Sequence, residues 1–160
     1  MIPIQVYGAI GARAYADTGS GGLFASGSEL ITGFYNTRVP EGAEFPYVEY
    51  NVVSSQQADA FAMRVVEIEL DMHVYVAERP QAGGTDPFQR GVAILTRIAG
   101  DWSVQATRVP SFGFDRHPLD LSAGTWTGGY MERIGGSEQH EDGMLHWVES
   151  YRLTASKVAT

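Results

Sequence analysis

The sequence predicts an α+β fold: a mostly antiparallel β-sheet with two α-helices packed on one face, extended by a C-terminal β-hairpin. Residues 65–76 and 144–153 alternate apolar and polar side chains, whereas residues 4–17 and 87–99 repeat apolar side chains at helical spacing. A chain of 160 residues is long enough to bury one core. We expect a single domain over residues 1–160, with its core in about residues 2–100 and a β-rich extension in about residues 101–160.

Residues 65–76 organise the predicted sheet. Every second residue from Val66 to Val76 is apolar, and the residues between them are Glu67, Glu69, Asp71, His73 and Tyr75. This period of two is typical of a strand with one buried face, because a helix would scatter the same residues around its circumference. The strand therefore has one face on the core and one acidic face.

Two helices are predicted from their apolar spacing and their end signals. In the first, residues 4–17, the stripe is Ile4, Tyr7, Ile10 and Ala14. The second, residues 87–99, follows an N-cap at Asp86 and stops at Gly100. Its predicted buried stripe is Phe88, Val92, Leu95 and Ala99, flanked by Ile94 and Ile98.

The remaining predicted elements are strands and loops. Residues 30–39 and 45–53 are rich in strand-forming side chains, and the polar residues 54–59 read as a long connection to the central strand. Residues 102–106 and 113–115 are short strand candidates. Residues 128–134 and 144–153 form a predicted closing hairpin around a polar loop at residues 135–143.

Composition excludes several classes of protein. A net charge of -8 argues against a general nucleic-acid-binding surface, which needs clustered Arg and Lys. The absence of cysteine excludes disulfides and thiolate metal sites. The sequence shows neither a secretory signal nor a stretch that spans a membrane, so we expect a soluble protein that is intracellular at synthesis.

Histidines and carboxylates gather in one predicted loop, at Glu138, His140, Glu141, Asp142 and His146. These side chains suit zinc or manganese, but their spacing matches no known helical metal motif. An acidic loop between glycines is more typically solvated. We therefore expect no metal ion at this loop. A small metal-dependent enzyme that uses these residues remains an alternative.

The acidic row Glu67, Glu69 and Asp71 has two interpretations. It is either a solvated strand face or the lining of a channel through which DNA slides without sticking, because like charge repels phosphate. The net charge of the chain agrees with the second interpretation.

The order of elements resembles the tail terminators of long-tailed phages, the tail-completion proteins that join the tail to the head. The resemblance covers about residues 2–100. It rests on the N-terminal helix, the strand motif Phe45-Pro46-Tyr47-Val48-Glu49-Tyr50, the strand ending Val74-Tyr75-Val76, and the capped helix that follows. The C-terminal part is longer than the compact form of that family.

The resemblance implies a virion protein of the tail or neck, assembled in the host cytoplasm as a homo-oligomeric ring, with a hexamer expected. It also implies no catalytic residue and no cofactor, so the protein is predicted not to be an enzyme. Such a ring sits on the tail-tube protein, faces a head-closure or neck protein, and lets DNA pass without specific binding or any membrane contact. Tyr47, Tyr75 and Trp147 are then expected as interface anchors, and Glu67, Glu69 and Asp71 as channel-lining residues. A head-closure or other neck protein is the nearest alternative, and a monomeric ligand-binding domain is a third.

Overall fold

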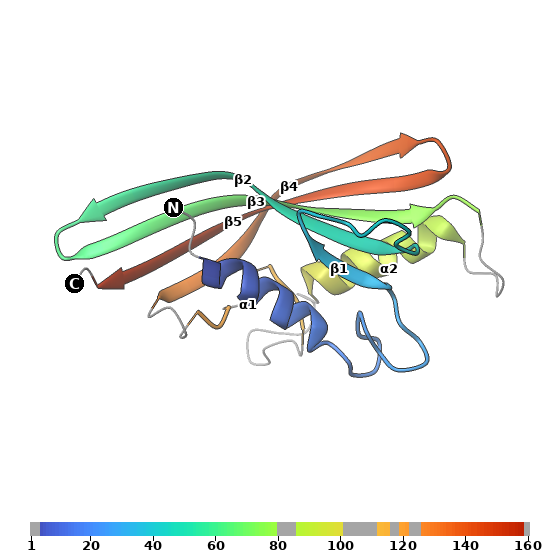
Figure 1. The fold of residues 1–160 in the computed structure, drawn as a ribbon, viewed down its shortest axis with the longest axis horizontal. Coiled ribbons are helices and arrows are strands. Elements are labelled where there is room, and N and C mark those ends of the chain that lie inside the picture. The colour runs from blue at the N-terminus through green and yellow to red at the C-terminus, as the bar shows by residue number, and fades with distance from the viewer. Residues whose placement is uncertain (1–3, 80–85, 101–111, 116–118, 122–125, 159–160) are drawn as a thin grey trace.

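The computed structural model describes residues 4–79, 86–100, 112–115, 119–121 and 126–158, and within them it has one mixed five-stranded sheet and two helices. This confirms the predicted α+β class. In chain order the elements are α1 (Ile4–Tyr15), β1 (Gly33–Asn36), β2 (Tyr47–Ala60), β3 (Met63–Ala77), α2 (Pro87–Ala99), β4 (Thr127–Glu141) and β5 (Met144–Val158). The strand order is β1-β2-β3-β5-β4, and both helices lie on one side of the sheet (Figure 1).

The predicted central strand is the middle strand of the sheet. β3 pairs antiparallel with β2 from Met63 to Tyr75 on one side and with β5 from Met63 to Ala77 on the other. Its apolar residues point toward the helices and are buried: Val66, Ile68, Leu70, Met72, Val74 and Val76. The period-two prediction is confirmed, because each of these side chains meets the core while its neighbours face away.

Two predicted loops are strands instead. Residues 54–59 continue β2 to a two-residue turn at Phe61 and Ala62, and residues 135–141 continue β4 to a turn at Asp142 and Gly143. Neither segment needs an alternating apolar pattern, since both extend past the helix-covered region, where both faces of the sheet meet solvent. The backbone ladder alone keeps these polar segments in the sheet.

The strands outrun the helices at both ends of the sheet (Figure 1). At one end the β2–β3 hairpin projects beside the C-terminal half of β5, and at the other the β4–β5 hairpin projects. We call residues 59–64, around the first of these turns, the β2–β3 tip.

Helix α2 has the predicted bounds and N-cap, but its buried stripe is different. The Asp86 side chain accepts a hydrogen bond from the backbone N–H of Phe88, and Gly100 follows the last turn with φ 93°. The buried residues are Gly91, Ile94 and Ile98, whereas Phe88 and Val92 are exposed. The predicted stripe was therefore wrong, because the helix is rotated about its axis and buries a different set of residues.

Gly91 explains this rotation. A side chain at this position would overlap the ring of Trp147 from β5, so the missing Cβ lets the indole pack directly on the helix backbone. A large aromatic surface buried at this contact outweighs the exposure of two apolar residues on the far side.

The segment after α2 completes the core. Phe112, Phe114, Leu119 and Leu121 are buried in the same cluster as β3 and β5. The strand predicted at residues 113–115 is reduced to a single parallel bridge between Asp115 and Met131. The candidate strand at residues 102–106 lies outside the described residues. None of the helices described is long and apolar enough to cross a membrane.

We expect Gly91→Ala to destabilise the domain by about 1–3 kcal/mol, because the added methyl group must push the Trp147 ring out of its site. Gly8→Ala in α1 is the matched control. It meets nothing within 4 Å and should stabilise the helix by up to about 1 kcal/mol. Urea unfolding of both variants measures the difference, and equal gains in stability would contradict the packing of Trp147 on Gly91.

Candidate functional site

The face of the sheet opposite the helices is the first candidate site. It carries the polar residues of β3 together with residues from β2 and β5, as the strand registers place them side by side. Glu67, Glu69 and Asp71 lie on this open face, as expected from the sequence.

The acidic row is partly neutralised by β5. Arg152 donates a hydrogen bond to Glu69 over 3.1 Å, and its Nε lies 3.7 Å from Glu67. The bond to Glu69 raises the pKa of the Arg152 guanidinium. Asp71 accepts a hydrogen bond from the Ser150 hydroxyl at 2.6 Å. The side chains of the row are thus held in place by hydrogen bonds and ion pairs, and the three carboxylates face a single arginine.

Beside the acidic row lies a cluster of aromatic and histidine rings. Tyr47 and Tyr75 have ring centroids 5.1 Å apart, and Tyr75 stacks on His146 at 4.3 Å. His146 also stacks with His73 at 5.1 Å. Alternation within β3 predicted that Tyr75 and His73 share a face, but it did not predict His146, whose position depends on the register of β5.

Hydrogen bonds fix the tautomers in this cluster. His146 Nδ1 lies 3.1 Å from Glu141 Oε1, and His146 Nε2 lies 2.9 Å from His73 Nδ1. An ionised carboxylate only accepts, so His146 donates from Nδ1 and, when neutral, accepts at Nε2 from His73. The three side chains form one directed chain that holds His146 buried on a face that is otherwise open.

Burial shapes the titration of these groups. Desolvation, followed by the nearby His146, lowers the pKa of His73. Burial, followed by the charge on Glu49, raises the pKa of Tyr75 to about 12 and also raises that of Tyr47. Near neutral pH the tyrosines are therefore uncharged and serve as hydrogen-bonding, stacking surfaces rather than as anions.

Trp147 does not belong to this surface. It is 5% exposed and lies beneath α2, where it packs on Gly91 and near Phe88. The expectation that Trp147 anchors an interface was wrong. Side chains alternate between the two faces along β5, and Trp147 lies on the core face.

The residues considered as metal ligands do not converge. His140 lies opposite Leu145 and His146 lies opposite Gln139, so the two histidines point to opposite faces of the β4–β5 hairpin. His140 is paired with Glu138 at 3.3 Å, and His146 with Glu141. The described part of the chain holds no group of three or more His, Asp or Glu residues that could bind a metal ion.

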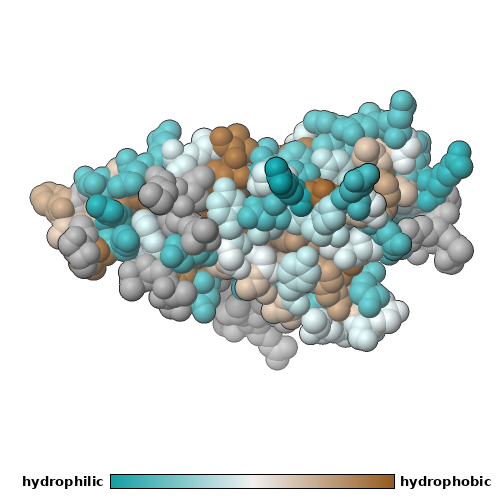
Figure 2. Space-filling view, in the orientation of Figure 1, coloured by the Kyte–Doolittle hydropathy of each residue, from teal (hydrophilic) through white to brown (hydrophobic). Residues whose placement is uncertain are grey.

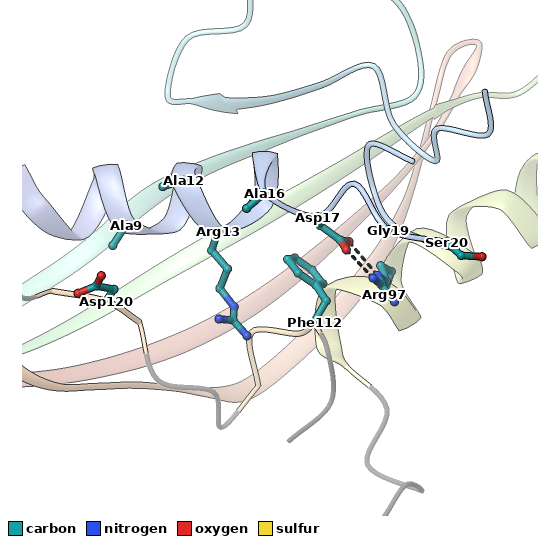
Figure 3. A pocket seen from close by; sticks show the side chains of 10 residues that line it. All are labelled: Ala9, Ala12, Arg13, Ala16, Asp17, Gly19, Ser20, Arg97, Phe112 and Asp120. Carbon is teal, nitrogen blue, oxygen red and sulfur yellow. Dashed lines mark hydrogen bonds and ion pairs between the residues drawn. The ribbon is translucent and has the colours of Figure 1, made fainter. Parts of the chain in front are cut away.

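A second candidate is a cavity of about 500 Å³ between the end of α1, α2 and the segment around Phe112 (Figure 3). Its apolar wall is Ala9, Ala12, Ala16 and Phe112. Its charged residues are Arg13, Asp17, Arg97 and Asp120. Sequence reasoning missed this cavity, because its walls come from segments far apart in the chain.

The charged groups of the cavity have structural partners. Arg97 forms an ion pair with Asp17 and donates from Nε over 2.8 Å, while Asp17 also accepts from the backbone N–H of Leu23. Arg13 donates to the Gly113 carbonyl at 2.8 Å, and burial lowers its pKa. Both arginines also lie over the Phe112 ring. Among the described residues, the lining combines an apolar wall with two arginines and two aspartates and includes no histidine for acid–base chemistry.

No model of a known protein family matches the chain, and a search of curated proteins gives no match.

The lowered pKa of His73 predicts a pH dependence of stability. As pH falls below 6.5, the unfolded chain binds a proton at this residue before the folded one does. Stability therefore drops until the pH passes the lowered pKa, below which both states are protonated. Between about pH 7 and about pH 5, the free energy of unfolding should therefore fall less for His73→Gln than for the wild type.

The control for this comparison is His140→Gln, whose side chain is 71% exposed. Its pH dependence should follow that of the wild type. Urea unfolding at each pH gives the comparison, and parallel curves for all three proteins would refute the role given to His73.

Proposed function

We propose that the protein is a structural virion protein, a phage tail terminator that caps the tail tube as a ring and joins the tail to the head or neck. The observation that carries the proposal is the division of the sheet into a helix-packed face and an open acidic face, on strands that project beyond the helices at both ends (Figure 1). A ring subunit needs both features: a surface that DNA passes without adhering, and projecting elements that reach neighbours.

The channel role is assigned to Glu67, Glu69 and Asp71. They lie in one row on the open face, and Arg152 and Ser150 hold them in place. Fixed carboxylates repel the phosphate backbone, and the single arginine within the row lies between Glu67 and Glu69, which limits its contact with phosphate.

Tyr47 and Tyr75 are the proposed interface anchors. They lie adjacent on the open face with Tyr35 and Phe45, and their raised pKa values keep the phenols neutral and able to donate hydrogen bonds. Rigid aromatic side chains with a polar end are typical of contacts that dominate binding energy.

The alternatives differ in what they require. A head-closure or other neck protein would use the same ring and differ in the partner it binds. The metal-enzyme hypothesis needs a convergent ligand set, and His140 and His146 lie on opposite faces. A monomeric ligand-binding domain would use the cavity beside α1 and would not self-associate.

The decisive measurement is the solution mass across a concentration series, with negative-stain imaging of the same samples. We expect rings, with six subunits as the predicted number, that form on their own or on addition of tail-tube protein. A single-chain mass under both conditions would overturn the proposal. Binding to a head-closure protein but not to the tube would favour the neck alternative.

We expect the triple variant Glu67→Gln, Glu69→Gln and Asp71→Asn to assemble normally but to slow genome passage, because three charges that repel phosphate are lost. The matched control neutralises three exposed glutamates elsewhere, Glu41, Glu44 and Glu78. Ejection kinetics of particles assembled with each variant measure the effect. Equal rates for the two triple variants would remove the channel role from this row.

A further inference from the structure

The β2–β3 tip carries an exposed phenylalanine in a conformation that does not suit it. Phe61 is fully exposed and has φ 55°, in the two-residue turn that joins the strands. Positive φ in such turns favours Gly or Asn, and a bulky side chain there is an outlier. The local structure therefore offers no reason for an aromatic residue at this position.

Two other exposed apolar side chains lie at the same end of the sheet as Phe61. Met63 and Val158 are also exposed and lie opposite each other in the β3–β5 ladder. Figure 2 shows apolar atoms at this end of the molecule. The tip is thus a small apolar projection at the end of a paired hairpin, a shape that can enter a pocket of a partner.

The pocket beside α1 fits such a knob. Its volume of about 500 Å³ is typical of sites that bury a small ligand, and its wall combines the small side chains of Ala9, Ala12 and Ala16 with the Phe112 ring. An incoming phenylalanine would contact the alanine side chains, since Phe112 is 5% exposed and lies under the guanidinium groups of Arg13 and Arg97.

The charges of the two surfaces also agree. The tip holds Asp59 and Arg64, which lie opposite each other in the β2–β3 ladder, and the described lining of the pocket includes Arg13 and Arg97 together with Asp17 and Asp120. Among the described residues, the tip and the pocket lining each carry equal numbers of positive and negative side chains. Arg13 is desolvated and would gain from an added carboxylate such as Asp59.

The tip does not reach the pocket of its own chain. In Figure 1 it lies at the far end of the sheet from the C-terminal end of α1, and the paired strands between them hold it there. We propose that the β2–β3 tip of one copy inserts Phe61 into the α1 pocket of the next copy. Resting on the proposed ring function, this gives that ring its contact: different surfaces meet head to tail, as ring closure requires.

Cross-linking tests the contact directly, because the chain has no cysteine. The double variant Ala62→Cys and Ala16→Cys keeps Phe61 and places thiols beside the tip and on the pocket rim, both at exposed positions. A short bismaleimide should give a ladder of covalent oligomers, with the two cysteine peptides joined. The control pairs Ala62→Cys with Ser137→Cys on the exposed edge strand β4, and should give none above the level of Ala62→Cys alone.

Two single variants separate the two halves of the contact. Phe61→Gly relieves the positive φ and should raise folding stability while weakening self-association at least tenfold. Ala12→Trp fills the pocket and should weaken self-association similarly, whereas Gly8→Trp, one turn away and outside the lining, should not. Mixing Phe61→Gly with Ala12→Trp leaves one intact tip and one intact pocket, so heterodimers should form, with no larger species.

These outcomes separate the contact from the function. If Phe61→Gly still forms rings, the contact is overturned and the ring function stands. The same holds if the double cysteine variant forms rings like those of the wild type but does not cross-link. A ladder and heterodimers without closed rings would support the contact and count against a tail terminator. No cross-link and no association would overturn both.

Discussion

The structure depends on β3 being paired on both sides from Met63 to Tyr75. β2 and β5 form hydrogen bonds with its backbone N–H and C=O groups. Its alternating side chains are therefore divided between a buried face and a solvent-exposed face. From Val66 to Val76 the buried face lies under α1, α2 and the segment around Phe114. A register slip of one residue would place Glu67, Glu69 and Asp71 in the core, which makes this register strongly specified.

The same division explains why the open face is ordered as well as polar. Because β5 lies next to β3, Arg152 and Ser150 meet the acidic row and His146 meets His73 and Tyr75. The face thus combines a row of carboxylates with a stacked aromatic cluster. Neighbouring strands hold these groups in fixed positions.

The two strand extensions show where apolar alternation in the sequence no longer predicts strands. Residues 54–59 and 135–141 are polar on both faces, which is typical of loops, yet both are strands. They pair because a hairpin already in register continues its ladder, and because solvent reaches both faces. The result is two projecting arms, of which the β2–β3 arm ends in Phe61.

Local signals in the sequence located α1, α2 and β3, because capping, helical spacing and strict alternation act over neighbouring residues. They also placed the acidic row on its open face. The tertiary structure decided everything that depends on contacts between distant segments: the rotation of α2 set by Gly91 against Trp147, the burial of Trp147, the Glu141–His146–His73 chain, and the pocket closed by Asp17 and Arg97. Periodicity along one strand says which residues share a face, but only the pairing partner and its register say what they touch.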